Sequence, residues 1–344
     1  MTVYRVFKAF LFVVALPAFS QQGARTDRRI TLDVVVTDKA GKAQSGLQQS
    51  DFTVVDNKLP QKMVSFQAVE GTATPAPPVE IILVVDRVNS SFAGAANERQ
   101  QTEKFLRQNG GQLQLPTSIA FVSDSGTTMQ TATKDGNALV TALEQSDNAL
   151  RTTSRKSQGF YGAGDQFELS LKALNGVADY AGKIPGRKLL IWLSPGWPLL
   201  SGPRVELSSK DQQGLFRTIV AVSGELREAG ITLYSIDPLG LADAAGPGVT
   251  YYQEFLKGVS KSSQVQAGDL ALQVLAVQSG GKALNSSNDI VRQIGSCIAD
   301  AHAWYTVSFD SPPADGPDEY HKLEIKVDKP GLTARTNTGY YAQP

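Results

Sequence analysis

Hydrophobic and polar residues alternate at both ends of the chain, a pattern that is typical of half-buried β-strands. The stretch ITLDVVVTD, which begins at Ile30, places an apolar residue at every second position. Neither end has enough predicted strands for a core of its own, so we expect the two groups to pair into one small β-sandwich. The other predicted strands are 51–56 and 61–69 near the N-terminus and 304–310, 321–329 and 332–342 near the C-terminus.

The middle of the chain has a different pattern, in which short apolar runs without alternation are separated by longer helical stretches. Such runs are typical of strands that are buried on both faces of a parallel sheet. Strands and helices in alternation indicate a doubly wound α/β domain. The predicted strands are 79–86, 117–124, 187–194 and 231–237, and the predicted helices are 95–109, 137–145, 166–183, 209–228 and 288–303.

These patterns predict how the chain is divided. The predicted fold class is α/β, with a doubly wound, mostly parallel sheet inserted in a small β-sandwich that the N- and C-terminal segments form. A Pro- and Thr-rich stretch at 71–78 cannot continue a ladder and is expected to be a linker. The sandwich takes residues 29–70 and 302–344, and the α/β domain takes 79–301.

The first residues have the pattern of a secretory signal peptide. A basic start with Arg5 and Lys8 is followed by an apolar stretch and by small residues near Ser20. We expect residues 1–20 to be removed and the mature protein to be exported, either to the periplasm or outside the cell. No later apolar run reaches the length that a membrane-spanning helix requires, so no transmembrane segment is expected in the mature chain.

Composition limits the classes of partner. The chain has 33 basic and 33 acidic residues, so it lacks the excess positive charge that binds nucleic acids or anionic membranes. Its single cysteine, Cys297, excludes an internal disulfide, and its helical spacing with Ile294 and Ile298 predicts a buried, inert thiol. We expect a protein partner.

The sequence holds no recognisable catalytic motif. Its two histidines, His302 and His321, both fall in the C-terminal β region, where we expect them on the surface. No Gly-x-Ser-x-Gly stretch, zinc-finger spacing or His-Glu-x-x-His motif is present. We therefore expect no enzymatic activity, and a hydrolase with an unrecognised carboxylate site is the alternative.

Four stretches of the chain carry a resemblance to a known family. They are VVVTDKAGKAQSGLQQSDFTVVDNKLPQKMVSF, ILVVDRVNSS, IPGRKLLIWLSPG and KVDKPGLTARTNTGYY. The α/β section resembles a von Willebrand factor type A domain, and the chain from Ile30 onward resembles the VWFA-related domain family described from acidobacteria. The resemblance implies an adhesion-type module with one divalent cation at the carboxyl edge of the sheet, held by oxygen ligands from three loops.

The first of these loops matches the family pattern in part. Asp86 corresponds to the aspartate of the family, and Ser90 corresponds to its second serine. Val88 stands in the first serine position and offers no oxygen ligand. Asn89 is a substitute ligand through its side-chain oxygen, one residue away from the family position.

The other two loops depart further from the family pattern. Pro195 stands where the family has an aspartate, and Asp165 is the oxygen ligand nearest to the missing threonine. We therefore expect either no cofactor or a weakly bound Mg²⁺ or Ca²⁺ at a degenerate site formed by Asp86, Asn89 and Ser90 with Asp165. The alternative is that Asp86 caps the loop that follows it.

The loop after the strand 187–194 is a candidate partner-binding surface. Ser194 and Trp197 lie there, followed by Leu199 and Leu200. An exposed apolar tip at the ligand-bearing edge is typical of a protein interface, and the alternative is a loop that folds back onto its own body. The sequence thus predicts an exported, non-enzymatic binding module of the adhesion type. A structural or assembly protein of the cell envelope is the alternative function.

Overall fold

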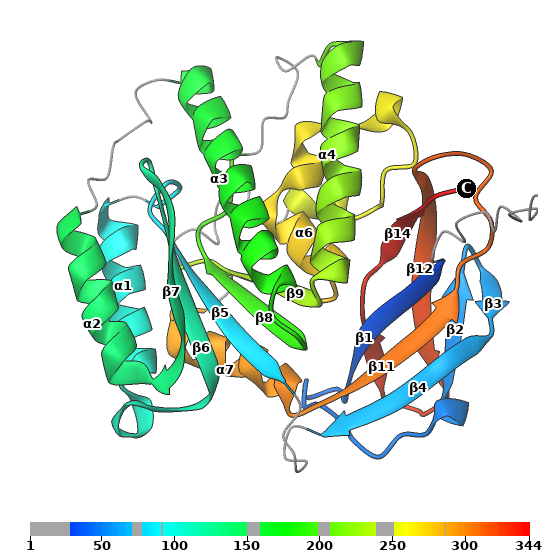
Figure 1. The fold of residues 1–344 in the computed structure, drawn as a ribbon, viewed down its shortest axis with the longest axis horizontal. Coiled ribbons are helices and arrows are strands. Elements are labelled where there is room, and N and C mark those ends of the chain that lie inside the picture. The colour runs from blue at the N-terminus through cyan, green and yellow to red at the C-terminus, as the bar shows by residue number, and fades with distance from the viewer. Residues whose placement is uncertain are drawn as a thin grey trace, which may run out of the picture.

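The computed structural model describes residues 28–70, 78–90, 92–149, 159–198, 207–238, 251–285 and 287–344. The predicted signal peptide, residues 71–77 of the predicted linker, and Leu199 and Leu200 lie outside these ranges. The described residues form three β-sheets, with helices packed on both faces of one of them (Figure 1).

The first sheet combines strands from the two ends of the chain. Its order is β13-β1-β11-β4, and all of its pairings are antiparallel. The alternation that begins at Ile30 places Ile30, Leu32 and Val34 in the core, because successive side chains of a strand point to opposite faces. The strands are β1 (Arg29–Thr37), β4 (Met63–Glu70), β11 (Ala303–Asp310) and β13 (Thr333–Arg335).

The second sheet packs against the first and is also antiparallel, with the order β14-β12-β2-β3. One hydrophobic cluster joins the two sheets and includes Leu32 and Phe309 from the first sheet and Val54 and Leu323 from the second. Strands from both ends of the chain therefore share one core. The strands are β2 (Phe52–Asp56), β3 (Leu59–Gln61), β12 (Glu319–Val327) and β14 (Gly339–Ala342).

The third sheet has six strands in the order β10-β9-β8-β5-β6-β7. All of its pairings are parallel except the antiparallel pairing of β6 with β7. Every residue of β5 and β8 is buried, as expected for central strands that are covered on both faces. The strands are β5 (Val79–Asp86), β6 (Gln112–Ser123), β7 (Gly126–Asp135), β8 (Arg187–Leu193), β9 (Ile231–Ile236) and β10 (Ala283–Leu284).

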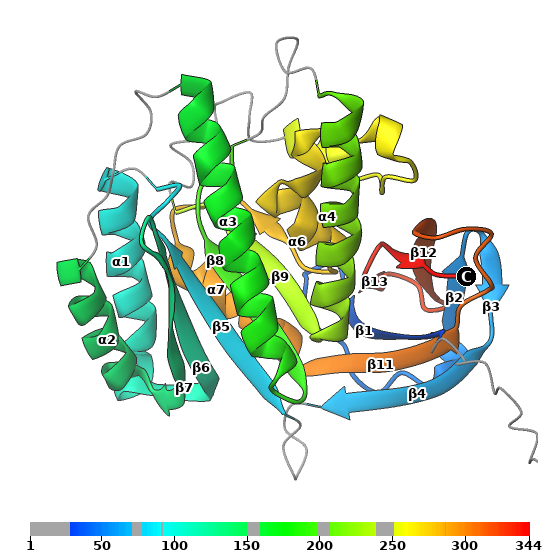
Figure 2. The same ribbon diagram turned by 45° about the horizontal axis from the view of Figure 1, so that its top comes forward.

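Helices cover the six-stranded sheet on both faces (Figure 2). One face packs against α3 (Gly159–Gly182), α4 (Ser209–Glu228) and α6 (Leu272–Gln278), and the other against α1 (Phe92–Leu106), α2 (Gly136–Ala149) and α7 (Ile290–Ile298). No helix among the described residues is long and apolar enough to cross a membrane. The 3-10 helices are η1 (Gln49–Asp51), η2 (Gln108–Gly111), η5 (Tyr252–Phe255), η6 (Ser262–Gln264), η7 (Ala267–Leu270) and η8 (Ala299–Ala301).

The predicted fold class, a doubly wound and mostly parallel sheet inserted in one small β-sandwich, is wrong. The described residues form two antiparallel four-stranded sheets and one mixed six-stranded sheet, and only the last is mostly parallel. One reason is that the sequence prediction missed β7. Its Thr-rich sequence lacks a buried apolar run, yet a turn after Ser123 pairs it with β6 as an antiparallel edge strand. A polar strand of this kind is stabilised by its ladder rather than by burial.

A buried ion-pair network connects the first sheet to the helical part of the molecule. The Asp300 carboxylate, which is 1% exposed, accepts a hydrogen bond from Arg335 of β13 at 2.7 Å. The Tyr234 hydroxyl of β9 donates to the same carboxylate at 2.7 Å, and Lys282 lies at 3.5 Å. Two cations and one phenol therefore satisfy a single buried acid, as a buried charge requires.

Candidate functional site

Asp86 ends β5, and its carboxylate is fully buried and saturated with hydrogen-bond donors. Its Oδ1 accepts from the backbone N–H groups of Val88 at 3.0 Å and Asn89 at 3.1 Å. Its Oδ2 accepts from the Asn89 side-chain amide at 2.8 Å and from the indole N–H of Trp192 at 2.9 Å. Each carboxylate oxygen thus has two donors, so Asp86 caps the loop that follows it.

Ser90 is engaged with a second buried carboxylate. The Ser90 hydroxyl donates to Glu98 Oε2 at 3.0 Å, and the other oxygen of Glu98 accepts from the backbone N–H of Asp86 at 2.9 Å. Burial raises the pKa of Asp86 and raises that of Glu98 well above its usual value, although Arg87 opposes the shift at Glu98. Both acids therefore belong to the packed interior of the sheet edge.

These residues do not fit a divalent cation. Mg²⁺ and Ca²⁺ take at least six oxygen ligands, whereas each carboxylate oxygen of Asp86 already accepts from two N–H donors and the Ser90 hydroxyl is directed at Glu98. Asn89 Oδ1 is buried without a hydrogen-bond partner, and one such oxygen is far from a full ligand set. Asp165 is exposed on α3 and shares no hydrogen bond with the other three among the described residues. Across the described ranges, no three His, Cys, Asp or Glu side chains are grouped as metal ligands.

The predicted exposure of Trp197 is wrong. Its side chain is 3% exposed and packs edge-to-face on Trp192, with ring centroids 5.3 Å apart and an interplanar angle of 74°. Ser194 is fully buried, and its hydroxyl accepts from the backbone N–H of Gly196 at 3.2 Å. The left-handed backbone of Gly196, with φ 106°, allows the turn that carries Trp197 back onto the body. The described start of the loop, up to Pro198, folds onto its own domain, as the alternative interpretation of the sequence held.

A buried polar cluster in the second sheet was missed. His321 was expected on the surface together with His302, but only His302 is exposed. His321 Nδ1 lies 2.8 Å from Asp56 Oδ1, and the Tyr340 hydroxyl donates to Asp56 Oδ2 at 2.6 Å. The sequence pattern could have predicted the burial of His321, because His321 and the buried Leu323 are two residues apart and share one face of β12.

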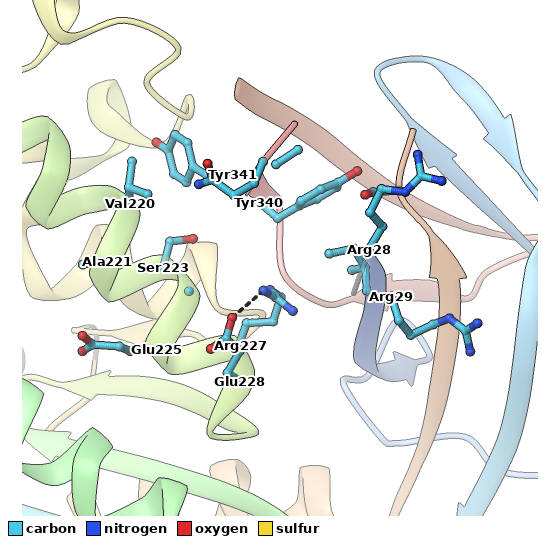
Figure 3. Close-up of a pocket in the computed structure, with 15 residues that line it drawn as sticks. Arg28, Arg29, Val220, Ala221, Ser223, Glu225, Arg227, Glu228, Tyr340 and Tyr341 are labelled. Carbon is cyan, nitrogen blue, oxygen red and sulfur yellow. Dashed lines mark hydrogen bonds and ion pairs between the residues drawn. The ribbon is translucent and has the colours of Figure 1, made fainter. Parts of the chain in front are cut away.

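A groove runs between α4 and the start of β1. One cavity of about 630 Å³ lies between α4, β14 and the first residues of β1 (Figure 3). A second cavity of about 460 Å³ continues along β1 past Thr31 and Asp33, and shares Arg29, Arg227 and Glu228 with the first. Both volumes are in the range of ordinary ligand pockets. We call the two cavities together the β1 groove.

The lining of the β1 groove carries both signs of charge. Arg227 extends from α4 into the groove and forms an ion pair with Glu228, with an N–O distance of 3.1 Å (Figure 3). In the same view the guanidinium groups of Arg28 and Arg29 point away from α4. Burial and neighbouring carboxylates raise the pKa of Glu225 on α4. A polar lining of mixed charge suits a polypeptide better than a ligand of one strong charge.

The ladder between β1 and β11 fixes which backbone groups of β1 face the groove. The carbonyl of Arg28 accepts from the N–H of Ser311 at 2.9 Å, and the register continues from this pair along the two strands. Because bonded and non-bonded pairs alternate in an antiparallel ladder, the even-numbered residues of β1 bond to β11. The odd-numbered residues Arg29, Thr31 and Asp33 direct their N–H and C=O groups to the opposite side, and all three line the groove.

On that side β1 has a partner over only part of its length. β13 pairs with Val35–Thr37, and among the described strands none pairs with Thr31 or Asp33 there. The chain then leaves the first sheet, because the N–H of Thr338 donates to the carbonyl of Gln278 at 3.0 Å. The β1 groove therefore lies beside open backbone, in the position that a longer β13 would fill. Sequence patterns could not show this feature, since it depends on where β13 ends.

Comparisons with known proteins give only distant matches, and no family model and no curated protein matches the chain. The human COPII-coat protein Sec24c matches with 8% identity over 80% of this chain and 46% of that chain, at a TM-score of 0.34. The pilus adhesin SpaC from Lactobacillus rhamnosus GG matches with 12% identity over 87% of this chain and 49% of that chain, also at 0.34. The pilus adhesin RrgA from Streptococcus pneumoniae matches with 8% identity over 53% of this chain and 28% of that chain, at 0.23. The chain spans less than half the length of each of these structures, and such TM-scores do not establish a shared fold.

Proposed function

We propose that the protein is an exported, non-enzymatic binding module of the adhesion type, which holds an extended segment of a partner protein in the β1 groove. The partner segment adds to the first sheet as a strand beside β1. The observation that carries this proposal is the open backbone at Thr31 and Asp33, which lines the cavity of about 460 Å³ in the β1 groove. Strand addition to an exposed sheet edge is a common mode of peptide recognition.

The groove also supports a preference for polar partner segments. A strand presents alternate side chains to its two faces, so one set of partner side chains lies toward α4. There Arg227, Glu225 and Glu228 offer both a cation and carboxylates. We expect segments that carry Lys or Arg together with Asp or Glu, and main-chain hydrogen bonds to Thr31 and Asp33 supply the part of the affinity that does not depend on sequence.

The test is selection of linear peptides from a random displayed library on the purified chain, followed by affinity measurement on two variants. Thr31→Pro removes an N–H that faces the groove and leaves the ladder to β11 intact, because proline is tolerated on the open side of an edge. Loss of a main-chain hydrogen bond and the added ring weaken binding by about tenfold or more. Thr31→Val keeps the N–H and the branched side-chain shape, and is expected to bind as the native protein does.

Two results would contradict the proposal. The first is that no linear peptide is selected at all. The second is that selected peptides bind Thr31→Pro as tightly as Thr31→Val, which would place the binding surface elsewhere. Turnover on a panel of glycosides and esters would instead support the hydrolase alternative.

A further inference from the structure

The outer edge of the first sheet is open on the side away from the β1 groove. β4 is the last strand in the sheet order β13-β1-β11-β4, and Figure 2 shows it along the lower border of the molecule. From Met63 to Val69 it contains no charged residue and no proline, which are the usual protections of an edge strand. Among the described residues, no backbone hydrogen bond joins β4 to a strand other than β11.

Exposed apolar side chains gather at this same edge. The large hydrophobic residues exposed in the described part of the chain are Leu59, at 65%, and Val64, at 48%. Leu59 lies on β3, the edge strand of the second sheet, and Val64 lies on β4. Only Lys62 separates β3 from β4, so the two edges lie on one side of the molecule. Apolar side chains beside an open edge are typical of an interface.

The ladder identifies the backbone groups of β4 that are open. Because the odd-numbered residues of β11 bond to β1, its even-numbered residues bond to β4. The register pairs Trp304 with Val69 and Thr306 with Gln67, so the backbone N–H and C=O groups of the odd-numbered residues of β4 are bonded to β11. The N–H and C=O groups of Phe66, Ala68 and Glu70 therefore point outward. An irregularity at Val64 interrupts the ladder and limits the regular open stretch to these residues.

We propose that a second copy of this chain binds here, with the two β4 strands antiparallel about a two-fold axis at Ala68. In this register Ala68 pairs with its own counterpart, and Phe66 of each copy pairs with Glu70 of the other. All the open donors and acceptors of the regular stretch are used, and none is left over. The two first sheets become one continuous sheet across the axis.

The choice of a second copy as occupant follows from the symmetry of the edge and its charges. The open residues Phe66, Ala68 and Glu70 are centred on Ala68, whose small side chain lets the strands approach at the axis. Glu70 is the only charged residue of β4. In the antiparallel register Glu70 of each copy lies opposite Phe66 of the other, so the two Glu70 side chains are at opposite ends of the paired stretch. No like charges are therefore opposed, which a self-pairing strand requires.

Disulfide trapping tests the register. In the proposed dimer the two Ala68 Cα atoms form a hydrogen-bonded antiparallel pair about 5.5 Å apart, which is within disulfide range. Ala68→Cys is expected to form a covalent dimer on mild oxidation. Gln67→Cys is the matched control, because residue 67 lies opposite residue 69 of the second copy and cannot reach its own counterpart. The native thiol of Cys297 is buried and does not interfere.

Sedimentation velocity over a range of concentrations tests the interface without a cross-link. The native chain is expected to pass from monomer to dimer as concentration rises. Ala68→Pro, which removes an outward N–H and no bond to β11, is expected to stay monomeric with an unchanged melting temperature, whereas Ala68→Ser dimerises. A native chain that is monomeric throughout would overturn the proposal, as would equal cross-linking of the two cysteine variants. Capture of a different protein by β4 without self-association would also overturn it.

Discussion

Replacement of Asp86 by alanine separates a structural carboxylate from a metal ligand. The substitution removes the acceptor of four donors, namely the backbone N–H groups of Val88 and Asn89, the Asn89 amide and the Trp192 indole. A buried donor that loses its partner costs about 1–3 kcal/mol. Two effects make the total destabilisation smaller than the sum over four donors. The Asn89 amide retains a hydrogen bond to Ser170 at 2.8 Å, and the cost of burying the Asp86 carboxylate disappears.

The net destabilisation expected for Asp86→Ala is about 3–5 kcal/mol, because the N–H groups of Val88, Asn89 and Trp192 lose their acceptor and the relieved carboxylate burial offsets part of that cost. At roughly 2–4 °C per kcal/mol, the melting temperature falls by about 6–20 °C. Asp86→Asn is the matched control, because it keeps one acceptor oxygen and is expected to fall between the native protein and the alanine variant. Circular dichroism melts with chelator and with added Mg²⁺ provide the measurement.

A metal ligand would behave in the opposite way. Removing a carboxylate from a cation site leaves the metal-free protein as stable as before, or more stable, and abolishes stabilisation by Mg²⁺. An unchanged melting temperature for Asp86→Ala in chelator, together with a large Mg²⁺ shift in the native protein, would refute the reasoning. Stabilisation by a ligand grows as the logarithm of its concentration over its dissociation constant, so a competent site gives a clear shift.

Two further predictions concern stability. Burial raises the pKa of Asp269 from 3.8 to about 6, so its protonated form favours folding. This contribution is fully present below pH 3.8 and is lost as pH rises through about 6. The native protein should therefore gain up to about 3 kcal/mol relative to Asp269→Asn as pH falls from about 7 to about 4, and urea titrations that run parallel for the two proteins would contradict this. Arg335→Ala leaves Asp300 with one cation at 3.5 Å, and is expected to lower stability by about 2–3 kcal/mol while Arg335→Lys loses less. A melt of Arg335→Ala that matches the native curve would show that the ion pair is not needed.

The sequence predicted local features better than long-range ones. Alternation from Ile30 and the apolar run 79–86 predicted β1 and β5, because burial on one or two faces leaves a direct pattern in the residues. β7 was missed because a Thr-rich edge strand has no such pattern. Its absence from the prediction is one reason why the fold class was wrong.

The candidate site depended on contacts between distant residues. The environment of Asp86 is set by Trp192, which is 106 positions away, and no local pattern shows that an indole N–H meets the carboxylate. No local pattern shows the β1 groove either, because the backbone at Thr31 is open only as a result of where β13 ends. By contrast, the burial of Cys297 was predicted from helical spacing and is confirmed, with burial raising the pKa of the thiol to about 12.

Residue-resolved hydrogen exchange along β1 tests the central claim most directly. In the free protein the amides of Thr31 and Asp33 face the groove, whereas those of Leu32 and Val34 bond to β11. We expect Thr31 and Asp33 to exchange at least about tenfold faster than their even-numbered neighbours, and to become protected when a selected peptide is bound. Uniformly slow exchange from Thr31 to Val34 in the free protein would contradict the account, as would bound peptide that leaves Thr31 and Asp33 unprotected.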